Sequence, residues 1–204
     1  MSILVQKYGG SSVATPEFVK AVANRIVACR EDHRTIAVVV SAMGRTTDQL
    51  VALANQVSRR PHGRDFDHLL AAGEQIAVSL LALALQDRGV PAISLTAAQC
   101  GIRTDSQFNR ARIQSIDTSR LRRELDAGKV AVIAGFQGVT DGEDLTTLGR
   151  GGGDITGAAI AAALEAEACE ICTDVDGVYT ADPSIVRDAR LVPEITFEEA
   201  IELA

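Results

Sequence analysis

The residue pattern with the clearest chemical meaning is a lysine followed by glycines near the amino terminus. Lys7 comes directly after the apolar run Ile3-Leu4-Val5 and directly before Gly9-Gly10-Ser11-Ser12. Thr15-Pro16 then supplies a helix N-cap and a first-turn proline, so the segment is typical of strand, glycine turn and helix. Glycine backbone N–H groups and a fixed cation together suit a phosphate. The alternative is an ordinary surface lysine at a strand end.

Two further loops of small residues, 41–44 and 149–154, follow a predicted strand or open a predicted helix. Ligands of parallel α/β sheets bind at the carboxyl ends of the strands, so the three loops could meet in one crevice. For any single loop, a purely conformational turn is the better interpretation. The Walker pattern is absent, and so is G-x-G-x-x-G after the first strand, which disfavours an ordinary P-loop or Rossmann site.

Acidic residues are the next candidates. Glu74 lies at the head of a predicted apolar helix, where a carboxylate either favours the helix N-terminus or contacts a substrate ammonium group. The acid-rich segment 173–183 could be a hairpin or a calcium-like loop, but its hydrophobic interleaving and the lack of a glutamate at the twelfth position argue against an EF-hand. We predict no protein metal site, because His33, His62 and His68 lack metal-ligand spacing.

The four cysteines are expected to be buried structural thiols. They are widely scattered and no secretion signal precedes them, so a disulfide framework is not expected. Cys169 and Cys172 form a C-x-x-C within a predicted strand, where a spacing of three sends the side chains to opposite faces.

Strands and helices alternate along the chain and must position these residues. The β-branched run 36–40 has no polar alternation, which suits a strand covered on both faces of a parallel sheet. A helix over 71–88 is apolar on most sides, so we expect it to be deeply buried, and a subunit interface is one place where that burial could occur. Further strands are predicted at 91–95, 130–134 and 170–173, and further helices at 120–127 and from the glycine-rich loop to about 167.

Finer patterns mark other elements. Phe18, Val22 and Ile26 form the apolar stripe of the first helix. Asp141-Gly142 offers a turn, and Thr196-Phe197-Glu198-Glu199 is a capping box that starts a helix. Another amphipathic helix is marked by Leu50, Leu53, Ala54 and Val57. The alternation predicts an α/β fold, a three-layer sandwich with a mainly parallel central sheet, in one domain over residues 1–204.

Composition limits the partners. The 204 residues are 47% hydrophobic and 23% charged, with a net charge of −7, as in a soluble globular protein. An acidic chain without a basic cluster is a poor partner for nucleic acid or an anionic membrane. No apolar run approaches the roughly 18 to 20 residues of a membrane span, and the amino terminus lacks a signal sequence. We therefore expect a cytoplasmic protein.

Six motifs, in order, resemble the catalytic domain of the aspartokinase family, which has the amino acid kinase fold. The resemblance runs from residue 3 to the end of the chain. It implies transfer of the γ-phosphoryl group of ATP to the β-carboxylate of L-aspartate, with Mg²⁺ bridging the phosphates, at the entry to lysine, threonine and methionine (diaminopimelate) biosynthesis. The motifs are Lys7-Tyr8-Gly9-Gly10-Ser11-Ser12, Val40-Ser41-Ala42-Met43-Gly44, Gly73-Glu74, Gly135-Phe136-Gln137-Gly138, Thr146-Thr147-Leu148-Gly149-Arg150-Gly151-Gly152, and Thr173-Asp174-Val175-Asp176-Gly177-Val178-Tyr179-Thr180-Ala181-Asp182-Pro183.

The resemblance also implies residue roles. Lys7 would neutralise the transferring phosphate and Asp154 would orient that lysine. Arg150 would hold a substrate carboxylate by a two-pronged contact, with Glu74 near the amino group. The ATP-binding residues would be Lys7, Tyr8, Gly9, Gly10, Ser41, Thr173, Asp174, Tyr179, Thr180, Ala181, Asp182, Pro183 and Ser184. The aspartate-binding residues would be Thr47, Asp48, Glu74, Arg150, Gly151, Gly152, Gly153 and Asp154.

Two departures from the family pattern bear on activity. The family usually has G-R-G-G-S-D-T-T-A where this chain has Gly149-Arg150-Gly151-Gly152-Gly153-Asp154-Ile155-Thr156-Gly157. Gly153 replaces a serine whose hydrogen bond would be worth about 1 kcal/mol, and Ile155 adds apolar bulk at the helix start. The family's later G-A-K-V-L-H-P segment and its ACT domains do not occur in the 204 residues.

We therefore expect a fold incomplete at the carboxyl terminus and a chain that alone is a weak or inactive kinase. As partners we expect L-aspartate and a homodimer, or a larger assembly with a chain that carries the remaining part. Two alternatives stay open: a non-catalytic nucleotide-binding or assembly subunit, and a kinase for a different carboxylate, carbamate or nucleotide.

Overall fold

The computed structural model describes residues 2–30, 35–173, 175–196 and 198–199. They belong to two compact units, residues 1–172 and 173–204. The first unit contains the sheets and the five α-helices of the described chain. The assignment of residues 1–204 to a single domain stays a prediction.

A parallel five-stranded sheet, in the order β3-β6-β2-β1-β9, forms the centre of the first unit. The central strands are buried along nearly their whole length because both faces are covered, as their unbroken apolar runs predict. Since all five strands are parallel, their carboxyl ends meet at one edge. The strands are β1 (Ile3–Tyr8), β2 (Thr35–Val40), β3 (Ala92–Leu95), β6 (Val130–Ala134) and β9 (Ala168–Cys172).

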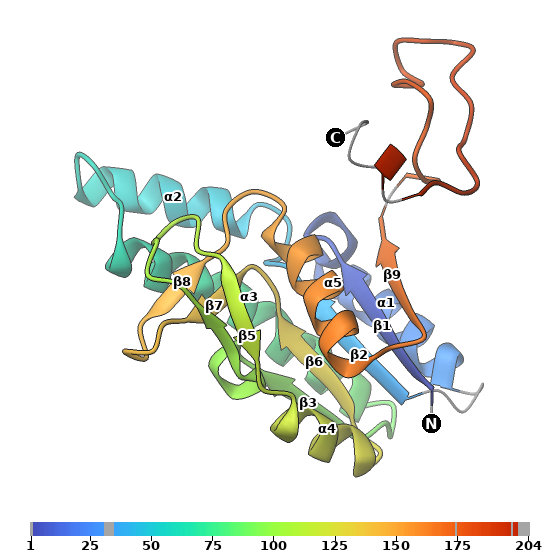
Figure 1. Ribbon diagram of the computed structural model, residues 1–204, viewed down its shortest axis with the longest axis horizontal. Helices are drawn as coiled ribbons and strands as arrows, with labels where there is room; N and C mark the ends of the chain where they lie inside the picture. The colour runs from blue at the N-terminus through green and yellow to red at the C-terminus, as the bar shows by residue number, and fades with distance from the viewer. Residues whose placement is uncertain (1, 31–34, 174, 197, 200–204) are drawn as a thin grey trace. The chain divides into compact units, whose positions relative to one another are not determined.

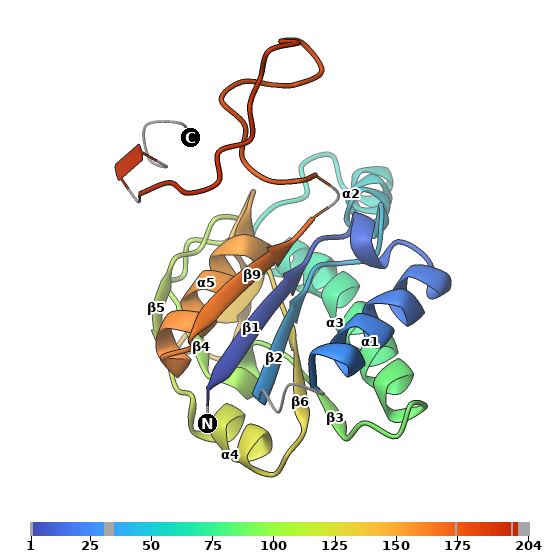
Figure 2. The same cartoon turned by 90° about the vertical axis from the view of Figure 1, so that its right-hand side faces the viewer.

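Helices cover both faces of this sheet and complete three layers (Figures 1 and 2). On one face, α1 (Pro16–Arg30) and α3 (Arg64–Gln86) pack against side chains such as Tyr8 and Val38. On the other face, α4 (Ser119–Asp126) and α5 (Gly152–Leu164) pack against Val5 and Val39. The predicted α/β architecture with a mainly parallel central sheet is confirmed.

A second, four-stranded sheet was not predicted. Its order is β5-β4-β7-β8, with antiparallel pairs at both ends and a parallel pair in the middle. The predicted turn at Asp141-Gly142 joins β7 and β8 as a hairpin, closed by Thr140 N–H donating to the Asp144 carbonyl at 2.9 Å. The strands are β4 (Ile102–Thr104), β5 (Ile113–Ile116), β7 (Gln137–Val139) and β8 (Leu145–Thr147).

The helix predicted over 71–88 differs from α3 in its start and its exposure. α3 begins at Arg64, because Asp67 N–H already donates to the Gly63 carbonyl at 3.1 Å. The helix is not buried on all sides. Ile76, Leu80 and Leu83 are exposed on one side, and the opposite side packs on the sheet. The prediction of deep burial is therefore wrong for one face, and the subunit interface stays a prediction.

The predicted stripes of the first two helices also need correction. Val19, Val22 and Ile26 point inward in α1, whereas Phe18 is 52% exposed. In α2 (Thr46–Val57) no residue is buried, and Val57 is 90% exposed. Leu53, Ala54 and Val57 of α2 instead line a groove together with residues at the start of α3.

By length and composition alone α3 resembles a membrane span: it has 23 residues, and its most apolar 18-residue window has a mean hydropathy of 1.6, so the expectation of no such apolar segment is wrong. Half of its most apolar window is buried inside the protein. It also carries two buried carboxylates, Asp67 and Glu74, both of which accept hydrogen bonds from the rest of the fold. These features are those of a core helix.

The C-x-x-C pair behaves as the strand pattern predicts. Cys172 belongs to the core on the α1 and α3 side of the sheet, and Cys169 packs against the core on the opposite side. All four cysteines are free thiols, and burial raises the pKa of Cys100 to about 12.

In the second unit, the acid-rich segment 173–183 supplies only one arm of an antiparallel pair, and the other arm lies beyond the segment for which a hairpin was considered. Tyr179 pairs with Leu191 in an antiparallel bridge, and Thr180 N–H donates to the Arg190 carbonyl at 2.9 Å. The capping box is confirmed by its reciprocal bonds, Thr196 N–H to Glu199 Oε2 at 2.9 Å and Glu199 N–H to Thr196 Oγ1 at 3.2 Å. Most of the helix predicted to follow lies outside the described residues.

Candidate active site

A cleft of about 340 Å³ lies where β1 and β2 end and α5 begins. The three small-residue loops predicted from the sequence meet here. Ten of its residues are ones that the sequence singled out for ATP or aspartate. The full lining is Lys7, Gly10, Ser41, Ala42, Gly44, Thr47, Glu74, Phe136, Gly149, Arg150, Gly151, Gly152, Gly153 and Asp154.

Close backbone packing builds the floor of the cleft. Gly10 and Gly44 bring the loops after β1 and β2 together, with Gly44 N–H donating to the Gly10 carbonyl at 2.9 Å. A Cβ at Gly10 would lie 2.7 Å from the Ala42 carbonyl oxygen, closer than atoms can approach. Glycine is therefore required at this position, for the close approach of two backbones rather than for a turn.

Lys7 extends from the end of β1 into the cleft and pairs with Asp154 in the first turn of α5. The Lys7 Nζ to Asp154 Oδ1 distance is 2.7 Å, with 11% of the lysine side chain and 54% of the aspartate side chain exposed. The ammonium group is thus held in place and still faces the cleft. This is where a phosphate would meet both a cation and the positive end of a helix dipole.

Glycines on α5 make room for Lys7. A Cβ at Gly157 would lie 3.2 Å from Lys7 Cβ, and a Cβ at Gly153 would lie 3.2 Å from Lys7 Cε and 2.7 Å from Ser41 Oγ. The lysine stem therefore crosses the helix over these two residues. The Ser41 hydroxyl occupies the space that a side chain would need at Gly153, where the related family usually has serine. Ile155 is 49% exposed and is not among the cleft residues.

Glu74 reaches the cleft from the middle of α3. It is 2% exposed, and its Oε1 accepts a hydrogen bond from Ala42 N–H at 3.1 Å. Its Oε2 is buried and has no hydrogen-bond partner among the described residues. Burial raises the pKa of Glu74 to about 7, against the opposing effect of the Ala42 bond. Because α3 begins at Arg64, stabilisation of the helix N-terminus does not explain this carboxylate.

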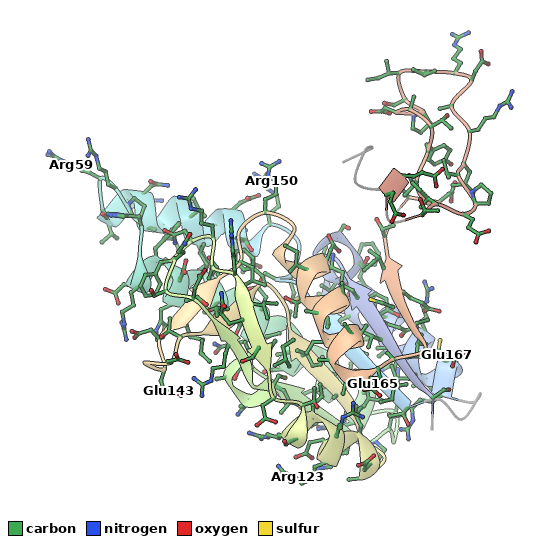
Figure 3. All side chains as sticks on the ribbon, viewed as in Figure 1. Arg59, Arg123, Glu143, Arg150, Glu165 and Glu167 are labelled. Atoms are coloured by element: carbon green, nitrogen blue, oxygen red, sulfur yellow. The ribbon has the colours of Figure 1, made fainter. Side chains whose placement is uncertain are left out.

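Arg150 and Thr47 also line the cleft. Figure 3 shows Arg150 on the loop that joins β8 to α5, extending away from the ribbon. None of the ion pairs among the described residues includes it, so its guanidinium group is available to an anion. Asp48, one residue after Thr47, instead lies on the surface of α2 beside Arg45, at 3.4 Å.

Several predicted ATP-binding residues are not among those that line the cleft. Tyr8 points to the opposite face of β1 from Lys7, where its hydroxyl donates to Gln6 Oε1 at 3.2 Å and burial raises its pKa. Gly9 adjoins the cleft, since its Cβ position is 3.6 Å from Lys7 Nζ. Asp174 lies outside the described residues. Thr173 and the 179–184 segment belong to the second unit, where Asp182 Oδ1 accepts bonds from the backbone and hydroxyl of Ser184.

Four cleft residues were not assigned to the site from the sequence: Ala42, Gly44, Phe136 and Gly149. All four belong to the six motifs quoted above from the sequence. Phe136 adopts a left-handed backbone with φ of 66°, and its ring would meet a Cβ at Gly152 at 2.9 Å. Such strain in a non-glycine residue is typical of functional sites, but it is visible only in the structure.

The cleft combines three recognition elements. A buried cation beside a helix N-terminus suits a phosphoryl group, an unpaired buried acceptor suits an ammonium group, and an unpaired guanidinium suits a carboxylate. Among the described residues no cluster of three His, Cys, Asp or Glu side chains could hold a metal ion. An amino acid next to a phosphate donor is the ligand set that this arrangement fits.

Comparison with known proteins gives the family. The model of the amino acid kinase family matches residues 2–204. The chain belongs to this family. Over all 204 residues it is 52% identical to an aspartokinase of Geobacillus stearothermophilus and 50% identical to aspartokinase 2 of Bacillus subtilis. The chain spans about half the length of these curated relatives, 50% in both cases.

Solved structures of the amino acid kinase family agree with this assignment. The aspartate kinase of Synechocystis superposes with a TM-score of 0.84 at 48% identity, over 98% of this chain and 33% of that one. E. coli aspartokinase III, in complex with aspartate and ADP, superposes with a TM-score of 0.88 at 28% identity, over 99% of this chain and 56% of that one. An isopentenyl phosphate kinase, at 22% identity and a TM-score of 0.73, shares the fold alone.

Proposed function

We propose that this chain carries the catalytic site of an aspartate kinase. The reaction transfers the γ-phosphoryl group of ATP to the β-carboxylate of L-aspartate and yields 4-phospho-L-aspartate and ADP. The proposal is supported by the similarity to aspartokinases along the whole chain and by the ligand set of the cleft.

The observation that carries the proposal is the unpaired oxygen of Glu74. A buried carboxylate oxygen without a donor costs free energy, and Glu74 lines a cleft that also contains Lys7 and Arg150. The α-ammonium group of an amino acid would supply the missing donor. Arg150 would then hold one carboxylate of the same molecule, and phosphoryl transfer would need a second carboxylate on it as the acceptor.

The chain's own residues would act by position and charge. A carboxylate oxygen is already nucleophilic, so no general base is required. As that oxygen forms its bond to the γ-phosphorus, the bond to the bridging oxygen of ADP breaks and no proton moves. Lys7 would neutralise the charge on the transferring group, Asp154 would keep the lysine aimed, and the backbone of Gly9 and Gly10 would cradle the phosphate.

The nucleotide and its metal complete this proposal. Mg²⁺ would neutralise the phosphate oxygens of ATP and be held mainly by them rather than by a protein cage. We assign Ser41, Thr173, Asp174 and residues 179–184 to nucleotide binding, and Thr47 and Asp48 to the substrate side. Lys7 is the one lysine among the described cleft residues, so we expect slow turnover from residues 1–204 alone.

The wider setting follows from the same proposal. We propose that the protein acts in the cytoplasm at the entry to lysine, threonine and methionine (diaminopimelate) biosynthesis. It would work as a homodimer, or in an assembly with a chain that supplies the other half found in its relatives. Nucleic acid and membranes are not proposed as partners.

A hydroxylamine trapping assay tests the function, because an acyl phosphate reacts to give a coloured hydroxamate. The purified chain would receive ATP, Mg²⁺ and one acceptor at a time: L-aspartate, L-glutamate or succinate. We expect hydroxamate with L-aspartate above all, since succinate lacks the ammonium group and L-glutamate is one carbon longer. Gly153, in place of the usual serine, favours a second candidate, a kinase for another small carboxylate. Equal or greater product with another acceptor would support it, and ATP binding without any product would support a non-catalytic subunit.

A further inference from the structure

A buried carboxylate outside the cleft ties three segments together. Asp67, in the first turn of α3, is 0% exposed. Its Oδ2 accepts hydrogen bonds from the backbone N–H groups of Asn109 and Thr147, both at 2.8 Å. Its Oδ1 accepts from the Thr147 hydroxyl at 2.8 Å and from the Asn109 side-chain amide. Four donors on one buried carboxylate form a strong and directional connection.

The residues bound to Asp67 lead directly to the cleft. Thr147 is the last residue of β8, three positions before Arg150, and α3 and β8 lie side by side in Figure 1. Its carbonyl accepts a bond from Ala111 N–H at 2.8 Å. The Asn109 carbonyl would lie 3.3 Å from a Cβ at Gly149, the first cleft residue of the glycine-rich loop. Asn109 Oδ1 in turn accepts from Gly63 N–H at 2.9 Å, which fixes the start of α3.

The same helix carries the other recognition group. Glu74 is seven residues after Asp67, two helical turns along α3, so both carboxylates lie on nearly the same face of the helix. Glu74 lines the cleft, and Asp67 accepts hydrogen bonds from the end of β8, the strand that leads to Arg150. The position of the Arg150 loop relative to Glu74 is therefore set through Asp67.

We propose that Asp67 is a positioning residue that fixes the separation between the ammonium site at Glu74 and the carboxylate site at Arg150. The inference rests on the proposed function, since it assumes a substrate that spans these two groups. Asp67 does not touch the substrate. It holds the two groups that do at the spacing of a small acidic amino acid.

The test uses Asp67→Asn in the full chain, with Asp65→Asn as the matched control. Asp65 is on the same helix turn, and its side chain is 91% exposed. In Asp67→Asn one acceptor oxygen becomes an NH₂ group, so at least one donor loses its acceptor whichever way the amide is turned. Calorimetry would give the Kd for ADP with Mg²⁺ and the Kd for L-aspartate in the presence of ADP. We expect the Kd for L-aspartate to rise about tenfold in Asp67→Asn and the Kd for ADP to change less than about twofold.

A second variant covers the case in which Asp67→Asn does not fold. Thr147→Val removes only the hydroxyl bond to Asp67 and keeps a β-branched strand residue, so we expect a rise of about fivefold in the Kd for L-aspartate. Hydrogen–deuterium exchange at residues 147–151 should quicken in both variants and remain unchanged in Asp65→Asn. These changes would not follow if Asp67 merely stabilised the fold.

The inference is overturned if L-aspartate binds both variants as tightly as it binds Asp65→Asn, or if ADP and L-aspartate weaken by the same factor. Failure of the proposed function has a different signature: the wild type and Asp65→Asn would bind ADP but no L-aspartate. In that case the exchange rates at 147–151 alone decide whether Asp67 holds the loop.

Discussion

The ionisation of Glu74 should make aspartate binding depend on pH. Burial raises the pKa of this carboxyl to about 7. Only the ionised form attracts a substrate ammonium group, so the ligand-free protein must lose a proton before it binds. At pH 6 about one-tenth of Glu74 is ionised and at pH 8 about nine-tenths, so the Kd for L-aspartate should be about tenfold higher at pH 6. The α-ammonium group of free aspartate stays charged over this range.

Isothermal titration calorimetry between pH 6 and 8, with ADP and Mg²⁺ present, measures this effect. Repeating the pH 7 titration in buffers of different ionisation enthalpy should reveal release of about half a proton per aspartate bound. Glu74→Gln should bind L-aspartate more weakly and lose the pH dependence. Glu167→Gln changes an exposed carboxylate outside the cleft and should keep the wild-type affinity and its pH dependence. The reasoning is refuted if the wild-type Kd is the same at pH 6 and pH 8, or if Glu74→Gln retains the wild-type slope.

Two predictions concern stability. The folded protein keeps Glu74 protonated to about pH 7, whereas an unfolded chain releases the proton near the ordinary pKa of 4.5, so stability falls as pH rises through this window. Relative to Glu74→Gln, the wild type should lose about 3 kcal/mol of unfolding free energy between pH 4.5 and 8, measured by urea denaturation; equal pH profiles would contradict this. Gly10→Ala places a Cβ 2.7 Å from the Ala42 carbonyl oxygen and should cost about 1 to 3 kcal/mol by the same method, with Gly63→Ala as a comparison for strain without a close contact. A loss no greater than in Gly63→Ala would show that backbone crowding is not the cause.

The strands of the central sheet could be predicted because their signal is local. The run at 130–134 coincides with β6, and the run at 36–40 falls within β2, since burial on both faces leaves no polar residue to interrupt them. The second sheet could not be predicted. Strands such as β7 and β8 have only three residues each, too short for any alternation to emerge, and their pairing depends on contacts distant in sequence.

The start of α3 was missed for a related reason. Its first residues, Arg64-Asp65-Phe66-Asp67-His68, are mostly polar, and Gly63 before them has no side chain to act as a cap. Tertiary hydrogen bonds, among them those that Asp67 accepts from Thr147, hold this first turn in place. The role of Glu74 therefore changes from a possible helix-terminus charge to an interior carboxylate with an unpaired oxygen.

Some residues of the candidate site could likewise be predicted from the sequence and others could not. Lys7, Gly10, Ser41 and Arg150 could be placed near one another because the carboxyl ends of parallel strands meet. Asp67 carries no motif of its own that marks a site, and its partner Thr147 is 80 positions away in the sequence. Only the fold brings them together.

The central claim is that Lys7 in this cleft supports phosphoryl transfer to L-aspartate. Hydroxamate formation under saturating ATP, Mg²⁺ and L-aspartate, compared between Lys7→Ala and Lys20→Ala, tests it most directly. Lys20 is an exposed lysine of α1 and is the matched control. We predict that Lys20→Ala keeps the wild-type rate while Lys7→Ala loses it by a factor of about 100 to 1,000, with folding unchanged by circular dichroism. Wild-type turnover in Lys7→Ala, or no aspartate-dependent hydroxamate from the wild type, would contradict the account.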